Sequence, residues 1–137
     1  MKIDKPILLV EDDEVDQMTV KRALSDIHVV NRLDITGDGE EALAFLRDEK
    51  KQKPGIILLD LNMPKMNGIE FLSVIKKDVN LKRIPVVILT TSEEEQDKVR
   101  SFDLGVAGYM VKPVDYAQFV EVVRTIDLYW TLSELSD

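Results

Sequence analysis

Residues 56–64 read Ile-Ile-Leu-Leu-Asp-Leu-Asn-Met-Pro, so an unbroken apolar run leads directly into an aspartate. A strand that is apolar at every position is typical of the inside of a parallel sheet, because helices cover both faces of such a sheet. Pro6–Val10 and Pro85–Thr90 have the same apolar character. We therefore predict that these three segments form the centre of one parallel sheet.

The whole chain alternates between short apolar segments and longer helical patterns. The five predicted strands are Pro6–Val10, Arg32–Thr36, Ile56–Asp60, Pro85–Thr90 and Gly108–Val111. The predicted helices span residues 14–27, 40–49, 68–77, 93–104 and 115–132. Arg32–Thr36 mixes polar and apolar residues, which places it at an edge. This order predicts an α/β fold, a doubly wound (βα)5 parallel five-stranded sheet of the flavodoxin-like type, whose known strand order is 2-1-3-4-5.

Length and composition favour one soluble domain. The 137 residues, 45% of them hydrophobic, fit a single domain over residues 1–137 with no output domain. The net charge of −8 argues against nucleic-acid binding, which needs a cationic surface. The chain has no cysteine, so it has neither disulfides nor thiolate ligands. No apolar run approaches the roughly 20 residues of a membrane helix, so we expect a cytoplasmic protein without a membrane partner.

Acidic residues follow two of the central strands. Glu11, Asp12 and Asp13 come after the first strand, and Asp60 ends the third. In a doubly wound sheet the functional crevice lies at the carboxyl ends of the strands. Two carboxylates about 4 Å apart repel by about 4 kcal/mol at an effective dielectric constant of about 20. A bound cation relieves this repulsion, and carboxylate oxygens suit Mg²⁺; a raised pKa on one acid is the alternative.

The next two strands end in residues that suit a phosphoryl group. Thr90 offers a hydroxyl donor, and Lys112 offers a cation that can pair with Asp60. Taken singly, such residues are more often helix caps, solvated acids or surface groups. Together at the strand ends they fit phosphoryl transfer, with Asp60 as nucleophile. Pro113 leaves two conformations open, a cis bond that fixes the direction of the lysine or a plain trans turn.

Five short motifs occur in a fixed order: residues 8–13 (LLVEDD), 58–64 (LLDLNMP), 66–68 (MNG), 85–90 (PVVILT) and 108–113 (GYMVKP). In this order and spacing the chain resembles the receiver domain of two-component response regulators, over essentially its full length. The resemblance implies a CheY-like switch that takes a phosphoryl group from a histidine kinase and then changes its protein–protein binding. It implies no separate enzymatic activity, only assistance to the domain's own phosphotransfer and dephosphorylation.

The resemblance also implies the roles of the acidic residues. Asp60 matches the phospho-acceptor. Glu11 and Asp12 match the acidic pair that, with Asp60, holds Mg²⁺. Asn62 matches the position that gives a backbone carbonyl to the metal. Glu11 stands where many family members have aspartate, so the side chain of this metal ligand is longer.

Three further residues match the family's switch. Thr90 matches the hydroxyl that follows the phosphoryl group, Lys112 the lysine that contacts it, and Tyr109 the aromatic residue whose rotamer changes on activation. Asn62 and Ser92 flank the path of attacking water, so they are expected to tune the lifetime of the phosphoryl group.

Within this family the chain looks most similar to the single-domain regulators that pair with phytochrome-type histidine kinases. The similarity rests on residues 83–92 (RIPVVILTTS) and on a long final helix that contains Tyr129 and Trp130. Such regulators often form homodimers through the face of helix 4, strand 5 and helix 5. Tyr129 and Trp130 either cover such an interface or pack on the domain's own flank.

The phosphodonor is expected to come from another protein. His28 is the one histidine, and it falls near the end of the first helix, far from the acidic cluster. The output is then a protein contact or a phosphorelay. Two alternatives are weaker. An aspartyl-nucleophile phosphatase often has an acid where this chain has Asn62, and a flavin or nucleotide carrier needs a phosphate cradle where it has acids.

Overall fold

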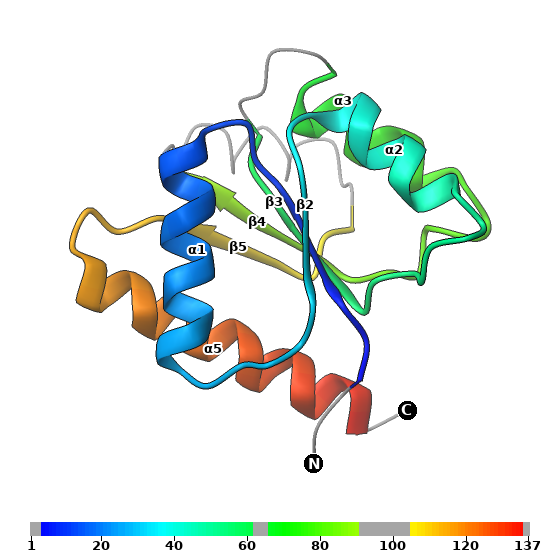
Figure 1. Cartoon of the computed structure of the whole chain (residues 1–137). Coiled ribbons are helices and arrows are strands. Elements are labelled where there is room, and N and C mark those ends of the chain that lie inside the picture. The colour runs from blue at the N-terminus through cyan, green and yellow to red at the C-terminus, as the bar shows by residue number, and fades with distance from the viewer. Residues whose placement is uncertain (1–3, 62–65, 91–104, 136–137) are drawn as a thin grey trace.

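The computed structural model describes residues 4–61, 66–90 and 105–135, with side chains as far as Leu132. The strands are β1 (Ile7–Val10), β2 (Leu33–Thr36), β3 (Ile56–Leu59), β4 (Val86–Thr90) and β5 (Gly108–Val111). The helices are α1 (Glu14–Asp26), α2 (Gly39–Arg47), α3 (Gly68–Lys76) and α5 (Tyr116–Leu135) (Figure 1). These elements confirm the predicted ones, except that α5 continues to Leu135. The helix predicted at 93–104 lies outside the described residues.

The strands form one parallel sheet in the order β2-β1-β3-β4-β5, as predicted. Ile7 at the start of β1 pairs with Leu33 on one side and with Ile56 on the other. β2, the strand of mixed composition, lies at an edge, and β5 forms the other edge. β1, β3 and β4 are buried at every position because both of their faces are covered.

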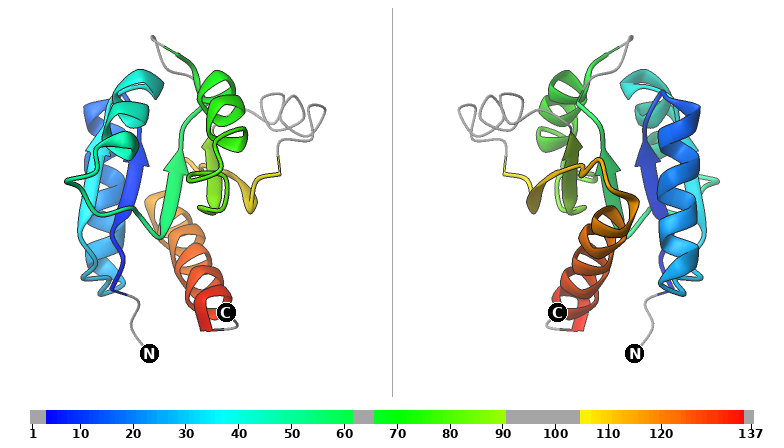
Figure 2. Two further views of the ribbon diagram at one scale, coloured as in Figure 1. Left: turned by 90° about the vertical axis from the view of Figure 1, so that its right-hand side faces the viewer. Right: turned by 90° about the vertical axis from the view of Figure 1, so that its left-hand side faces the viewer.

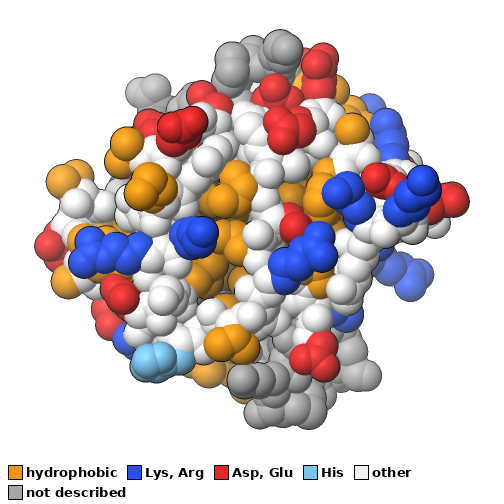
Figure 3. Space-filling view, viewed as in Figure 1, with side chains coloured by type: hydrophobic (Ala, Val, Ile, Leu, Met, Phe, Trp, Pro, Cys, Tyr) orange, Lys and Arg blue, Asp and Glu red, His pale blue; other side chains and the backbone are white. Residues whose placement is uncertain are grey.

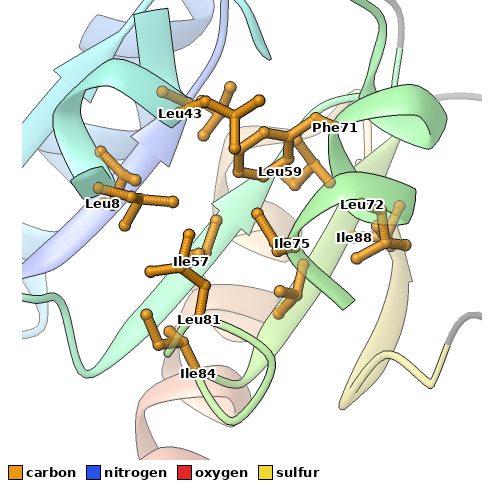
Figure 4. Close-up of a cluster of buried hydrophobic side chains, with 14 of the residues drawn as sticks. Leu8, Leu43, Ile57, Leu59, Phe71, Leu72, Ile75, Leu81, Ile84 and Ile88 are labelled. Carbon is orange, nitrogen blue, oxygen red and sulfur yellow. The ribbon is translucent and has the colours of Figure 1, made fainter. Parts of the chain in front are cut away.

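Two hydrophobic layers hold the helices on the sheet. On one face α2 and α3 pack over alternate residues of β1, β3 and β4, with Phe71, Leu72 and Ile75 fully buried (Figure 4). On the other face α1 and α5 pack over the remaining residues of the same strands. The alternation of side chains along each strand therefore divides the core between the two faces.

Each described helix begins at a polar residue at the carboxyl edge of the sheet. Asp13, Asp38 and Asn67 accept hydrogen bonds from backbone N–H groups in the first turns of α1, α2 and α3. Asp115 does the same for α5, where its Oδ2 accepts from Gln118 N at 3.1 Å. In Figure 2 the strand arrows point away from the end of the molecule where the chain begins. Polar groups therefore concentrate at one end of the domain.

Helix α5 carries two aromatic residues near its end, Tyr129 and Trp130, and their surroundings differ. Trp130 is buried between α5 and the starts of β1 and β3, beside Ile7 and Ile56. Its Nε1 has no hydrogen-bond partner among the described atoms. Tyr129 is 45% exposed. Of the two predicted alternatives, packing on the domain's own flank is therefore correct for Trp130, whereas Tyr129 is accessible to a partner.

His28 lies directly beyond α1 in the left-handed backbone region, with φ of 64°. Its N–H donates to Ser25 O, and the next residue, Val29, donates to Leu24 O. These bonds close the last turn of α1, so His28 terminates the helix. α1 runs antiparallel to the strands, so His28 lies at the opposite end of the domain from the carboxyl edge. Among the described helices, none is both long and apolar enough to cross a membrane.

We predict that Gly55→Ala destabilises the domain by about 1–3 kcal/mol, through overpacking. A Cβ on Gly55 would lie 2.8 Å from Trp130 Cζ2 and 2.8 Å from Lys5 Cβ. Gly108→Ala is the matched control, because its Cβ would meet Val87 methyl groups at 3.8 Å. Urea unfolding measures both changes. Equal stability of the two variants would contradict the packing of Trp130.

Candidate functional site

Sheet hydrogen bonds continue one residue beyond three strands and fix the backbone of the predicted site. Glu11 N–H donates to Thr36 O at 2.9 Å, and Asp60 N–H donates to Val10 O at 3.0 Å. Lys112 N–H donates to Thr90 O at 2.8 Å. The carboxyl ends of the parallel strands thus bring together residues that are far apart in the sequence.

Three carboxylates meet at this edge. One oxygen from each of Glu11, Asp12 and Asp60 lies within 4.8 Å of the others. Glu11 is buried, Asp60 half-buried and Asp12 exposed. Figure 3 shows acidic side chains along the upper edge of the molecule, the edge at which the strands end in Figure 1. Oxygen donors at this spacing fit a hard divalent cation, which would also relieve the repulsion between them.

The buried acid retains its proton to unusually high pH. Burial raises the pKa of Glu11 from its usual 4.5 to about 7, although the hydrogen bond and charge of Lys112 act to lower it. The charge of Asp60 and a hydrogen bond with its carboxyl group raise this pKa further. Two carboxyl groups in hydrogen-bond contact must share a proton or a cation, so the cluster is poised to exchange one for the other.

Lys112 is the cation of the site. Its Nζ donates to Glu11 Oε1 at 2.6 Å and lies 3.5 Å from Asp16 Oδ2. Burial acts to lower the pKa of Lys112, but the hydrogen bond with Glu11 and the charges of Glu11, Asp60 and Asp16 outweigh it, so the pKa is raised. The lysine therefore remains charged. The bond to Pro113 is trans, since the described peptide bonds include no cis bond, and the plain-turn alternative is correct.

Two residues on α1 join the site without having been predicted. Asp16 forms the ion pair with Lys112, and Gln17 Nε2 donates to Glu11 O at 2.7 Å. Helical side chains point back toward the helix N-terminus, so the first turn after a site strand reaches over that strand's end. The position of Asp16 and Gln17 in the first turn after β1 was therefore the sequence feature that could have identified them. Asp13, by contrast, is the N-cap of α1, because its Oδ1 accepts from Val15 N at 2.8 Å.

Thr90 and Tyr109 lie on the last two strands of the sheet. Thr90 is fully buried at the end of β4 and pairs with Val111 in the sheet register. Tyr109 on β5 is partly buried and packs against the core beneath α2 and α3. Asn62 and Ser92 lie outside the described residues.

A scan against protein-family models matches residues 7–124 to the response regulator receiver domain. The chain belongs to this family. The predicted family and fold are therefore confirmed, and the phosphatase and flavin-carrier alternatives give way to a receiver domain of two-component signalling. The receiver domain works as a signalling switch.

The relatives of this receiver domain include a phytochrome response regulator. Response regulator Rcp1 of Synechocystis sp. is 42% identical over 130 residues, which cover 92% of this chain and 88% of Rcp1. The solved structure of the phosphorylated cyanobacterial phytochrome response regulator RcpA is 41% identical with a TM-score of 0.85, covering 94% of this chain and 95% of RcpA. The Mn²⁺-bound form of Rcp1 matches with a TM-score of 0.82 at 42% identity, over 92% of this chain and 94% of that one. The predicted similarity to phytochrome response regulators is thus confirmed.

We predict that the free energy of unfolding of this receiver domain falls as pH rises through 7, when measured with a chelator present. Glu11 binds its proton more tightly when folded, with a pKa of about 7 instead of 4.5. Its contribution is therefore complete below pH 4.5 and is lost as pH rises through about 7. The loss is on the order of 3 kcal/mol.

Glu11→Gln has no proton to lose, so its stability should not show this component of the pH dependence. Urea unfolding of both proteins from pH 4.5 to 8 tests the difference. Parallel curves would contradict a protonated Glu11.

Proposed function

We propose that this receiver domain accepts a phosphoryl group on Asp60 and uses it to change its protein–protein binding. The observation that carries the proposal is that the half-buried Asp60 lies close to two other carboxylates and interacts electrostatically with Lys112. Glu11 is buried and bound to Lys112, which makes it a poor nucleophile. Asp60 combines partial access with nearby positive charge, which phosphoryl transfer requires.

Mg²⁺ is the proposed metal ion, held by Glu11, Asp12 and Asp60. The family resemblance adds the backbone carbonyl of Asn62. When bound, Mg²⁺ neutralises part of the charge on the entering phosphoryl group and on the acids. The donors are all oxygen atoms, which favours a hard ion over a thiolate- or imidazole-binding one. The similar regulator Rcp1 has been solved in a Mn²⁺-bound form, which supports a divalent ion in this chain as well.

The proposed transfer starts from a phosphohistidine on a partner kinase. A carboxylate oxygen of Asp60 attacks phosphorus and forms a P–O bond. The P–N bond breaks, and its electron pair stays on the histidine nitrogen. His28 cannot serve as an internal donor, since it lies beyond the far end of α1. The domain thereby assists its own phosphorylation, and with an activated water its dephosphorylation, without acting on a separate substrate.

The switch residues act after transfer. Lys112 is proposed to leave Glu11 for a phosphoryl oxygen, and Thr90 to donate its hydroxyl to another. Tyr109, two residues before Val111 on β5, is proposed to change rotamer when Thr90 moves. A phosphorylated site would in this way alter the surface formed by β5 and α5.

The proposed partners follow from the family and from charge. Response regulators are phosphorylated by histidine kinases, and the phytochrome-linked relatives favour a phytochrome-type kinase in the cytoplasm. The net charge of −8 disfavours nucleic acid as the target. A homodimer through the face of helix 4, β5 and α5 is the proposed output. The exposed Tyr129 and Leu132 of α5 and the exposed Val111 of β5 would contribute apolar area to it.

We predict that Asp60→Asn abolishes labelling by acetyl phosphate with Mg²⁺ while the domain remains folded. The amide cannot attack phosphorus, yet it nearly keeps the size of the carboxylate. A hydroxylamine-labile phosphoryl group, measured by intact-protein mass spectrometry, reports the result. Asp34→Asn, on the edge strand β2, is the control and should label as the wild type does. Labelling retained in Asp60→Asn would move the acceptor, with Asp12 the first candidate.

We predict that Lys112→Ala still binds beryllofluoride, an analogue of the aspartyl phosphate, with Mg²⁺ but loses the response of Tyr109. The variant should fold, because Glu11 already has a pKa of about 7 and can stay protonated without the lysine. ¹⁹F NMR with 3-fluorotyrosine measures the response, assigned with Tyr109→Phe among the three tyrosines. Lys82→Ala, at an exposed lysine, is the control. An unchanged Tyr109 response would remove Lys112 from the switch.

A further inference from the structure

The first residue of α2, Gly39, touches the backbone of Met66, two residues before α3. Gly39 N–H donates to Met66 O at 3.2 Å. A Cβ on Gly39 would lie 2.5 Å from that carbonyl oxygen and 2.8 Å from Met66 Cγ. The overlap with a backbone atom cannot be relieved by rotating a side chain. Gly39 does not have a positive φ, so the close approach is what requires glycine here.

The other side of this contact is firmly held. Asp38 Oδ1 accepts from Glu41 N at 2.9 Å, and Glu41 Oε2 accepts from Gly37 N at 3.1 Å. Thr36, at the end of β2, accepts the N–H of Glu11 through its carbonyl oxygen. The turn between β2 and α2 is therefore tied to the strand end that carries one of the three acids. The backbone of Gly39 is therefore held in place where it contacts Met66.

Met66 is held in an uncommon conformation at the point of contact. Its φ is 42°, in the left-handed region that a side chain disfavours. Its side chain packs against the core beneath α2 and α3. Such a conformation persists where surrounding contacts impose it. The carbonyl oxygen that faces Gly39 is one of those contacts.

From Met66 the contacts lead back to the acceptor. Asn67 and Glu70 cap α3 reciprocally, each side chain accepting from the other's backbone N–H. Gly68 N–H donates to Leu61 O at 3.0 Å. A Cβ on Gly68 would lie 2.6 Å from Asp60 O. A shift of Met66 would therefore also move Gly68, two residues later, which contacts the backbone of Asp60.

We infer that Gly39 is a positioning residue of the acceptor site: its contact with Met66 sets the backbone that carries Asp60. The inference rests on the proposed role of Asp60 as acceptor and metal ligand. A side chain at position 39 moves Met66 away from α2. The carboxylate of Asp60 then sits less well against those of Glu11 and Asp12, and divalent ions bind more weakly.

The test compares Gly39→Ala with Gly37→Ala. A Cβ on Gly37 meets Glu41 Oε2 at 3.4 Å, an ordinary contact with a flexible side chain. Alanine favours helix more than glycine does, so α2 itself is not weakened at its first position. Calorimetric titration with Mg²⁺ and the labelling rate with acetyl phosphate at saturating Mg²⁺ are measured where urea unfolding shows each variant fully folded.

Gly39→Ala should bind Mg²⁺ at least about tenfold more weakly, as when an outer-shell partner of a metal site is lost. It should also label more slowly, whereas Gly37→Ala should behave as wild type. A merely structural role would lower the stability of Gly39→Ala and leave the Mg²⁺ affinity of the folded protein unchanged, which would overturn the inference. If wild type binds Mg²⁺ but does not label, the proposed function fails, while the Mg²⁺ comparison still decides the role of Gly39.

A second measurement uses wild type alone, in case Gly39→Ala does not fold. Coupling between two sites is reciprocal, so metal and beryllofluoride bound at Asp60 must strengthen the contact of Gly39 with Met66. Hydrogen exchange followed by NMR should show the Gly39 amide slowing on addition of Mg²⁺ and beryllofluoride, relative to the Gly37 amide. Equal effects on both amides would overturn the inference.

Discussion

The ion pair between Lys112 Nζ and Glu11 Oε1, at 2.6 Å, is the contact on which the proposed switching of the acceptor site depends. It joins residues 101 positions apart in the sequence, from strand ends that two other strands separate. Removing one partner of a buried pair commonly costs about 3–5 kcal/mol, because the other charge is left without compensation. Here Glu11 can instead keep a proton, since burial places its pKa at about 7. The pair is therefore free to separate when another group takes the lysine.

This freedom explains how a static fold can support a switch. The strands supply fixed positions through sheet hydrogen bonds, so the backbones at Glu11, Asp60 and Lys112 are set before any ligand arrives. Charge, in contrast, is adjustable, because Lys112 interacts with the carboxyl groups of Glu11, Asp60 and Asp16, and the pKa of Glu11 is about 7. Binding of a divalent ion or a phosphoryl group would change the net charge of the groups around Lys112. The rigid part of the site lies in the backbone, and the responsive part in the side chains.

Much of this was predictable from the sequence, because apolar runs identify buried parallel strands and the residues after them share one edge. The strand-end positions of Glu11, Asp60, Thr90 and Lys112 were predicted on that ground, whereas their roles remain proposals. The partner of Lys112 was not predictable, since it depends on a rotamer and on distances across the sheet. Nor was the inward packing of Trp130. The contact of Gly39 with Met66 depends on how closely a helix end approaches a loop, which no sequence period encodes.

A crystal structure grown with Mg²⁺ and beryllofluoride tests the central claim most directly, namely that the strand-end residues form one phosphoryl-accepting site. We expect beryllium bonded to a carboxylate oxygen of Asp60. We also expect a metal ion bound by Glu11, Asp12 and Asp60, and Lys112 Nζ moved from Glu11 to a fluorine atom. Beryllofluoride on another side chain, or Lys112 still paired with Glu11 beside an occupied Asp60, would contradict the claim.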